Sequence, residues 1–271
     1  MTFALSHQRL GAETGYARTV FVVHGIMGSG RNWRSFATRM VERHPVLRVV
    51  LVDLRHHGDS QGAPPPDDLP SCAGDLLALA KDLREQEVVI RHSFGGNVFL
   101  EYAASSPVAL EKVFVLDCPV AAPEPEGRST SQVGRVVRTL QELAFPVTRR
   151  GEITKALEAR GFEHGLAAWM STNTTKEDGG YRLSFDLAAI QRLLDDYWSR
   201  DYHELLADPP SGIEIHIVRA LLSDRWSDAE MAQLATLDPD GPVQLHTLPE
   251  AGHWLHVDNP EGLLDLLDRW I

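Results

Sequence analysis

A serine, a histidine and two candidate carboxylates in this sequence each follow a predicted buried strand, where together they could carry out nucleophilic acyl transfer. Ser93 lies in "VVIRHSFGGN", residues 88–97, where a strand runs into a glycine-rich helix start. This strand–turn–helix context holds a serine in a strained turn with its hydroxyl above the sheet. Gly95 lets the following helix pack closely. Ser93 is therefore the predicted nucleophile, although an ordinary turn remains the alternative for this stretch taken alone.

Two backbone N–H groups are predicted to form an oxyanion hole beside Ser93. The pair His24-Gly25 follows an early strand in "VVHGIMGSG" and would turn the chain so that the N–H of Ile26 points at the nucleophile. The N–H of Phe94, at the helix start, would be the second donor. The same glycine-rich stretch is a near miss to the phosphate loop GxxxxGK[ST]. It lacks the required lysine and the magnesium-binding hydroxyl, which disfavours a nucleotide-hydrolysing function.

His253, in "AGHWLHVDNPE", is the predicted general base. It follows the last predicted strand, so a loop there could bring its imidazole over the sheet to Ser93. His256, three residues later, is the nearest competitor. A lone loop histidine is more often structural, but the chain order Ser…Asp…His favours a catalytic role here.

The carboxylate that orients this histidine has two candidates, Asp224 and Asp117. Asp224 follows the strand 213–218 and Asp117 ends the strand 112–116, so both lie at the carboxyl edge of the sheet, where α/β active sites form. Asp224 could instead cap a helix, and Asp117 could cap the entry to an insertion. Asp224 is preferred for its place in the order Ser…Asp…His, and Asp117 is the alternative acid.

The elements that must position these residues alternate between strand and helix. This alternation predicts an α/β fold with a mostly parallel central sheet and helices on both faces. Strands are predicted at 19–23, 48–52, 87–90, 112–116, 213–218 and 243–248, and helices at 32–43, 71–84, 95–105, 227–237 and 260–271. The alternation breaks between two proline-rich joints. Residues 1–119 and 211–271 are therefore assigned to the core and 120–210 to a helical cap insertion without a clear strand.

The composition excludes several classes of function. The net charge of −12 disfavours nucleic acid as a partner, since phosphate binding needs a basic surface. The two cysteines are far apart and favour a reducing compartment. No signal peptide or membrane span is predicted, so we expect a cytoplasmic protein. Histidine spacing supports no metal site, no dinucleotide fingerprint follows a strand, and no cofactor is expected.

Taken together, these motifs resemble those of the α/β-hydrolase superfamily. The matching residues are His24-Gly25, "DLRHHGDS" (53–60), "HSFGG" (92–96), Asp117, "SD" (223–224) and Gly252-His253. The insertion resembles the four-helix cap of a small esterase and thioesterase branch. This resemblance implies Ser93 as nucleophile, His253 as base and the N–H groups of Ile26 and Phe94 as the oxyanion hole. It also supports Asp117, because that branch has an aspartate at this strand end.

Arg91 departs from the family pattern, which has glycine or another small residue two positions before the nucleophile. By strand alternation, Arg91 points to the same side as Ser93. An unpaired buried charge costs several kcal/mol, so the arginine must reach solvent or a carboxylate unless the turn is distorted. We expect the elbow to survive with reduced or altered activity. Ala220 stands where the family usually has glycine, which is a milder departure.

The predicted function is hydrolysis of small-molecule carboxylic esters or thioesters through an acyl-enzyme on Ser93. Aromatic residues of the insertion are expected in the acyl pocket or in the core of the insertion, namely Phe145, Trp169, Tyr181 and Trp198. One alternative is a binding or receptor-like protein whose elbow is impaired by Arg91. A carbon–carbon hydrolase or a lyase with the same triad is another.

Overall fold

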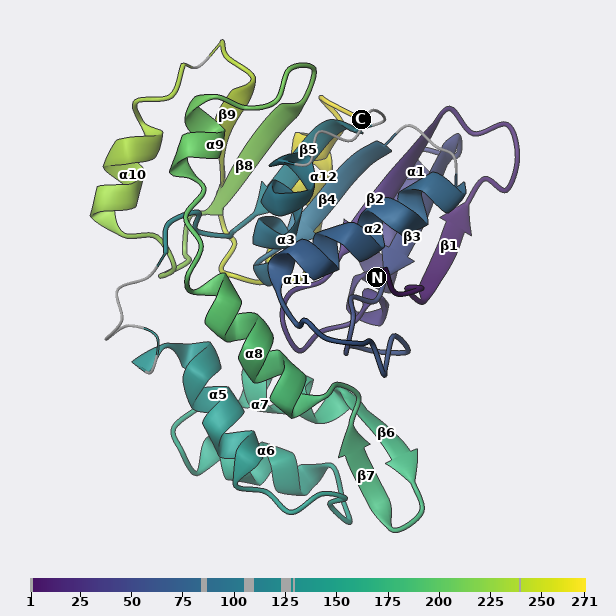
Figure 1. Ribbon diagram of the computed structural model, residues 1–271, viewed down its shortest axis with the longest axis vertical. Coiled ribbons are helices and arrows are strands. Elements are labelled where there is room, and N and C mark those ends of the chain that lie inside the picture. The colour runs from purple at the N-terminus through teal and green to yellow at the C-terminus, as the bar shows by residue number, and fades with distance from the viewer. Residues whose placement is uncertain (1, 84–86, 105–109, 123–127, 129, 239) are drawn as a thin grey trace.

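The computed structural model describes residues 2–83, 87–104, 110–122, 128, 130–238 and 240–271, without the side chains of residues 87, 88 and 91. Its centre is a seven-stranded sheet in the order β1-β3-β2-β4-β5-β8-β9 (Figure 1). Strand β1 pairs antiparallel with β3, and the other neighbours pair in parallel. The strands are β1 (His7–Gly11), β2 (Arg18–Val23), β3 (Leu47–Val52), β4 (Glu87–His92), β5 (Leu110–Leu116), β8 (Glu214–Ala220) and β9 (Val243–Leu248).

Apolar residues on both faces of the strands explain why helices cover the sheet on two sides. In β2, Val20 and Val22 belong to one buried cluster, whereas Phe21 and Val23 belong to the other. This is the period of two expected when successive side chains point to opposite faces. Figure 1 shows α2 and α3 in front of the sheet and α1 and α12 behind it. These helices are α1 (Arg34–Arg43), α2 (Leu69–Leu83), α3 (Phe94–Ala104) and α12 (Pro260–Leu267).

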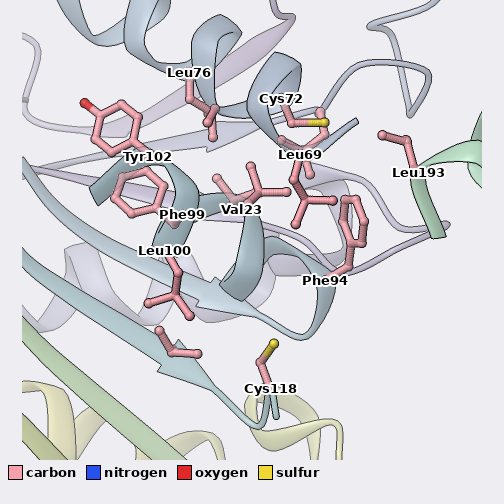
Figure 2. Packing of buried hydrophobic residues seen from close by; sticks show 14 of the residues in the cluster. Val23, Leu69, Cys72, Leu76, Phe94, Phe99, Leu100, Tyr102, Cys118 and Leu193 are labelled. Atoms are coloured by element: carbon pink, nitrogen blue, oxygen red, sulfur yellow. The ribbon is translucent and has the colours of Figure 1, made fainter. Parts of the chain in front are cut away.

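Packing on the α2–α3 face fixes the helix that follows Ser93. Figure 2 shows Phe94, Phe99 and Tyr102 of α3 packed among side chains of α2 and β2. The rings of Phe99 and Tyr102 are stacked, with centroids 4.1 Å apart. Burying an aliphatic or aromatic side chain of this size contributes about 1.5–3 kcal/mol. Packing against the core therefore fixes the start of α3 and, with it, the turn that contains Ser93.

An inserted segment separates β5 from β8 along the chain, although the two strands pair with each other in the sheet, and most of the segment lies beyond the end of the sheet (Figure 1). It contains α5 (Gln132–Gln141), α6 (Gly151–Glu158), α7 (His164–Thr172), β6 (Thr174–Glu177), β7 (Gly180–Leu183), α8 (Leu187–Tyr197) and α9 (His203–Ala207). The expectation of an insertion without strands is wrong for β6 and β7. They form an antiparallel hairpin whose turn places Gly179 at φ 89° and Gly180 at φ 148°, a backbone conformation that favours glycine.

Each of the six strands expected in the core is present, with boundaries shifted by at most two residues. Strand β1 was not expected, because "HQRLG" is a polar, half-exposed edge strand with no continuous apolar run. Two further short helices, α10 (Asp228–Leu234) and α11 (Leu255–Asp258), follow β8 and β9. The division into a core and a cap at residues 120 and 210 stays a prediction.

Candidate active site

Ser93 occupies a sharp turn between β4 and α3. Its φ of 54° lies in the left-handed region, which is strained for a residue with a side chain. Two backbone hydrogen bonds hold this conformation: the Ser93 N–H donates to the carbonyl of Leu116 at 3.0 Å, and the Gly96 N–H donates to the carbonyl of Ser93 at 2.6 Å. A Cβ at Gly95 would lie 2.7 Å from the carbonyl oxygen of His24, so this position requires glycine. The backbone around Ser93 is therefore that of a nucleophile elbow.

His253 and Asp117 meet across the carboxyl edge of the sheet. The Nδ1 of His253 lies 2.8 Å from Oδ2 of Asp117. Since a carboxylate only accepts, Nδ1 carries the proton and Nε2 is left as the basic nitrogen. Ser93 and His253 line the same cavity. The structure thus assembles a serine, an imidazole in the tautomer of a general base and a carboxylate in the chain order expected from the sequence.

Asp117 is fully buried, and its carboxylate accepts four hydrogen bonds. Its φ is 45°, and its Oδ1 accepts from the Ala220 N–H at 3.1 Å and from the indole Nε1–H of Trp226 at 2.7 Å. Its Oδ2 accepts from the Ser223 hydroxyl at 2.6 Å as well as from His253. Burial raises the pKa of Asp117, but these bonds outweigh burial and the net pKa is lowered. Asp117 is therefore held as a carboxylate.

Burial is also the largest influence on His253 and lowers its pKa, while the bond to Asp117 partly raises it again. The net direction is downward from 6.5. The imidazole is consequently neutral near neutral pH, which is the form that can accept a proton from a serine hydroxyl.

The preference for Asp224 as the partner of His253 is corrected by this geometry. The Asp224 side chain is 99% exposed, and the ion pair it makes with Arg225 is long, at 3.9 Å. It lies at the rim of the cavity, whereas Asp117 makes the hydrogen bond to the imidazole. The loop after β8 contributes two donors to Asp117, the Ser223 hydroxyl and the Trp226 indole N–H.

Ile26 and Phe94, the two expected oxyanion donors, both line the cavity beside Ser93. Phe94 is the first residue of α3, so its N–H has no carbonyl from a preceding helical turn to bond. Ile26 lies in a turn closed by the Gly28 N–H and the carbonyl of Gly25 at 3.1 Å, with Met27 at φ 60°. Their role as oxyanion donors stays a prediction.

Hydrogen bonds from the "DLRHHGDS" loop (53–60) stabilise the turn that contains Ile26. The Met27 N–H donates to Nε2 of His57 at 3.1 Å, and the Leu54 N–H donates to Nε2 of His24 at 3.1 Å. Burial lowers the pKa of both histidines, which keeps these acceptor nitrogens unprotonated. His56 points elsewhere and bonds Asp67 at 2.6 Å, as expected for adjacent side chains that diverge. The loop has a structural function next to the site.

His92, which precedes Ser93, was not singled out by the sequence reasoning. Its Nε2–H donates to the backbone carbonyl of His253 at 2.6 Å, and the two rings lie 4.5 Å apart. This bond joins the turn at Ser93 to the loop that carries His253.

His256, the competing candidate for the base, instead stacks on Trp33, with ring centroids 3.9 Å apart, and burial lowers its pKa to about 4.

Residue 91 belongs to β4, where its backbone pairs with Val23 and Val115. The side chain of Arg91 lies outside the described residues, so the expected effect of this arginine stays a prediction.

A cavity of about 810 Å³ opens onto Ser93 and His253. Its wall combines the sheet edge with α5, α7, α8 and α10. Of the four aromatic residues expected in the acyl pocket or in the core of the insertion, Trp169 and Trp198 line the cavity. Phe145 packs against the buried core, and the Tyr181 ring packs against the Arg150 guanidinium. Within the described part of the chain, no group of three or more His, Cys, Asp or Glu side chains could hold a metal ion, and no helix is long and apolar enough to cross a membrane.

The chain is similar to known hydrolases over nearly its whole length. Residues 20–266 match the model of a family described as the alpha/beta hydrolase family. The sn-1-specific diacylglycerol lipase ABHD11 of Mus musculus is 26% identical, with 98% of this chain and 85% of that protein covered. The lipase LipV of Mycobacterium tuberculosis is 30% identical, with 88% and 86% covered. Among solved structures, a marine microorganism esterase has a TM-score of 0.83 and 24% identity, with both chains fully covered, which shows a common fold.

Proposed function

Since this chain belongs to the alpha/beta hydrolase family, we propose that it is a serine hydrolase that cleaves carboxylic esters or thioesters through an acyl-enzyme on Ser93. The observation that carries the proposal is the bond between the His253 imidazole and the buried Asp117, made in the cavity that contains the strained Ser93 turn. The esterase and lipase relatives support the ester as the reacting group.

In the acylation step, Nε2 of His253 removes the proton of the Ser93 hydroxyl as its oxygen attacks the acyl carbon. The tetrahedral oxyanion accepts hydrogen bonds from the N–H groups of Ile26 and Phe94. His253 then gives its proton to the departing alkoxide or thiolate, and the acyl group remains on Ser93. Asp117 stabilises the imidazolium during this step without becoming protonated.

In the deacylation step, His253 takes a proton from water as the water oxygen attacks the acyl-enzyme. The carboxylic acid is released, and the proton returns to the Ser93 oxygen. The apolar part of the cavity wall would hold the acyl chain, since pockets for such ligands are mainly apolar with a few polar groups. The apolar lining residues include Val133, Val136, Leu166, Met170 and Leu194.

The first test is labelling with a fluorophosphonate probe, which reacts with an activated serine whatever the natural substrate. We expect labelling of the wild type and none of Ser93→Ala. Turnover of short p-nitrophenyl esters by the same two proteins checks that the labelled serine performs catalysis. Activity that persists in Ser93→Ala would contradict the proposed nucleophile.

Arg91→Gly tests the departure from the family pattern. If the arginine only reduces activity, the wild type hydrolyses p-nitrophenyl esters and Arg91→Gly does so faster. A wild type that neither reacts with the probe nor turns over esters, together with an active Arg91→Gly, would instead indicate a binding protein on the same fold.

A further inference from the structure

Arg225 is a cation in the wall of the proposed catalytic cavity. It lies in the loop between β8 and α10, directly after Asp224, and lines the cavity with Ser93 and His253. Among the residues whose side chains the structure describes, it is the only lysine or arginine in that wall. Its side chain is 27% exposed, so it is partly shielded from water. A partly shielded cation acts more strongly on a bound charge than a fully solvated one.

The contacts of Arg225 leave its charge largely uncompensated. Its Nη2 donates to the neutral amide oxygen of Gln132 at 3.0 Å. Its one ion pair in the described structure is the long 3.9 Å contact with Asp224, whose side chain is 99% exposed, and such exposed pairs contribute little. A partly shielded guanidinium that bonds a neutral amide can still accept an anion.

The other carboxylates of the cavity wall are engaged elsewhere. Asp117 accepts from His253, Ser223 and Trp226. Glu230 accepts from the N–H groups of Val120 and Ala121 at 2.6 and 3.2 Å. In the described structure neither of them forms an ion pair with Arg225.

The positive charge of Arg225 also influences the histidines beside Ser93. Burial is the main cause of the lowered pKa of His253 and of His92, and the positive charge of Arg225 lowers both further. Because Arg225 and Ser93 line the same cavity, one substrate molecule can place an anion at Arg225 and its acyl carbon at Ser93.

We propose that Arg225 binds an anionic group of the substrate, a carboxylate or a phosphate, while Ser93 attacks the acyl carbon. This inference rests on the proposed hydrolase function and narrows its substrates to esters or thioesters that carry an anion. Arginine suits this role because its planar guanidinium offers paired donors that match the two oxygens of a carboxylate or phosphate. Arg225 thereby determines specificity without taking part in the bond changes.

The carboxylate case is tested with matched esters. The p-nitrophenyl monoesters of succinate, glutarate and adipate are compared with uncharged p-nitrophenyl esters of the same chain lengths. We expect the wild type to prefer the charged ester at one length at least, as a ratio of kcat/KM. Arg225→Gln should lower this ratio about tenfold or more, in line with a charged hydrogen bond worth more than ~1.4 kcal/mol. Arg225→Lys should retain part of it.

Two variants sharpen the comparison. Asp224→Asn removes the neighbouring negative charge and should raise the ratio in favour of the charged ester. Arg31→Gln removes an exposed arginine that lines a separate, smaller cavity and should leave the ratio unchanged. An equal fall of the ratio in Arg31→Gln and Arg225→Gln would attribute the preference to net charge and overturn the proposal.

The phosphate case uses thioesters with one acyl group and two leaving groups, phosphopantetheine and the uncharged N-acetylcysteamine. If the anion belongs to the leaving group, the preference and its loss in Arg225→Gln appear here and not with the carboxylate esters. If wild type and Arg225→Gln show the same ratio in both sets, the proposal is wrong.

A binding measurement separates this inference from the proposed function. Monomethyl glutarate is titrated into Ser93→Ala and into the double variant Ser93→Ala/Arg225→Gln, so that no turnover is needed. We expect the dissociation constant to increase tenfold or more in the double variant. Equal affinities would exclude an acyl-chain carboxylate as the anion bound by Arg225, and equal ratios for the two thioesters as well would overturn the proposal, whereas failure of fluorophosphonate labelling would contradict only the hydrolase function.

Discussion

Two loops leave neighbouring strands at the same edge of the sheet, and each carries an aspartate that the sequence offers as the catalytic acid. In the loop after β5, Asp117 is fully buried and accepts four hydrogen bonds. In the loop after β8, the side chain of Asp224 is 99% exposed. The two carboxylates are thus chemically identical but differ in burial and in the donors around them.

Side chains of the loop after β8 stabilise the buried carboxylate in the loop after β5. Ser223 and Trp226, on either side of Asp224, both donate to Asp117. Such donors offset the cost of burying a carboxylate, which is large when the charge is unpaired. The loop after β8 therefore stabilises the acid of the loop after β5, while its own aspartate remains in water.

The largest effect is expected from Asp117→Asn. The donors Ala220 and Trp226 would retain the amide oxygen at the Oδ1 position, so the NH2 group would face Nδ1 of His253. An NH2 group donates to Nδ1, so the imidazole would carry its proton on Nε2 and lose the tautomer that a base requires. We expect kcat for a neutral p-nitrophenyl ester to fall by about 10⁴, as for amidation of the acid in a serine protease. A fall of less than tenfold would exclude Asp117 as the triad acid.

Sequence patterns single out Ser93 and His253, which the structure brings to one cavity, but they favoured Asp224 over Asp117, the carboxylate that bonds the imidazole. Ser93 and His253 follow from local patterns, because a strand–turn–helix transition and a loop after the last strand are features of consecutive residues. The acid depends on how two loops more than 100 residues apart close over each other. The 2.8 Å contact between Asp117 and His253 is a property of that tertiary arrangement.

The next effect is on stability and concerns Trp226→Phe, which removes the indole donor to Oδ1 of Asp117. A hydrogen bond to a charged group contributes about 1.5–3 kcal/mol, so the free energy of unfolding at pH 7 should fall by about this amount. Trp270→Phe is the matched control, since its buried indole Nε1–H has no described partner. Denaturant unfolding of both variants gives the difference.

The pH dependence of this difference has a definite sign. The folded pKa of Asp117 is lowered from 3.8, so its carboxylate stabilises the fold above that value and loses this contribution as the pH falls through the folded pKa. The destabilisation of Trp226→Phe should therefore shrink below about pH 3.8. A difference that stays constant while Asp117 of the folded protein becomes protonated, as followed by NMR, would mean that Trp226 acts through packing and not through the charge.

The inserted segment shows where local patterns mislead. The insertion was expected to hold no clear strand, but Thr174–Glu177 and Gly180–Leu183 form the hairpin β6–β7, with Asp178 and Gly179 as its turn. The strands are four residues each, β6 mostly exposed and β7 mostly half-buried, so they carry little of the apolar alternation that predicts a strand. The turn and the pairing of the two strands determine where such short surface strands form. Hydrophobic periodicity detects neither of these features.

A smaller effect is expected on the pH profile of the wild type. His253 must be neutral to act as a base, and its pKa is lowered from 6.5, chiefly by burial. The acid limb of kcat/KM should therefore have its midpoint below pH 6.5, with activity retained at 6.5 and lost as the pH falls through the lowered pKa. A midpoint above 6.5, measured with an uncharged ester, would contradict a buried imidazole paired with Asp117.

The smallest effect is expected from Asp224→Asn with an uncharged ester. Because the Asp224 side chain is exposed and makes no hydrogen bond to the imidazole, kcat should change by less than about threefold, and the acid limb should move slightly downward as a nearby negative charge is lost. Steady-state kinetics of Asp117→Asn and Asp224→Asn in parallel compare the two loops directly. Equal losses of kcat in both variants would mean that catalysis depends on both aspartates. A greater loss of kcat in Asp224→Asn would mean that Asp224 becomes the acid after a rearrangement of its loop on substrate binding.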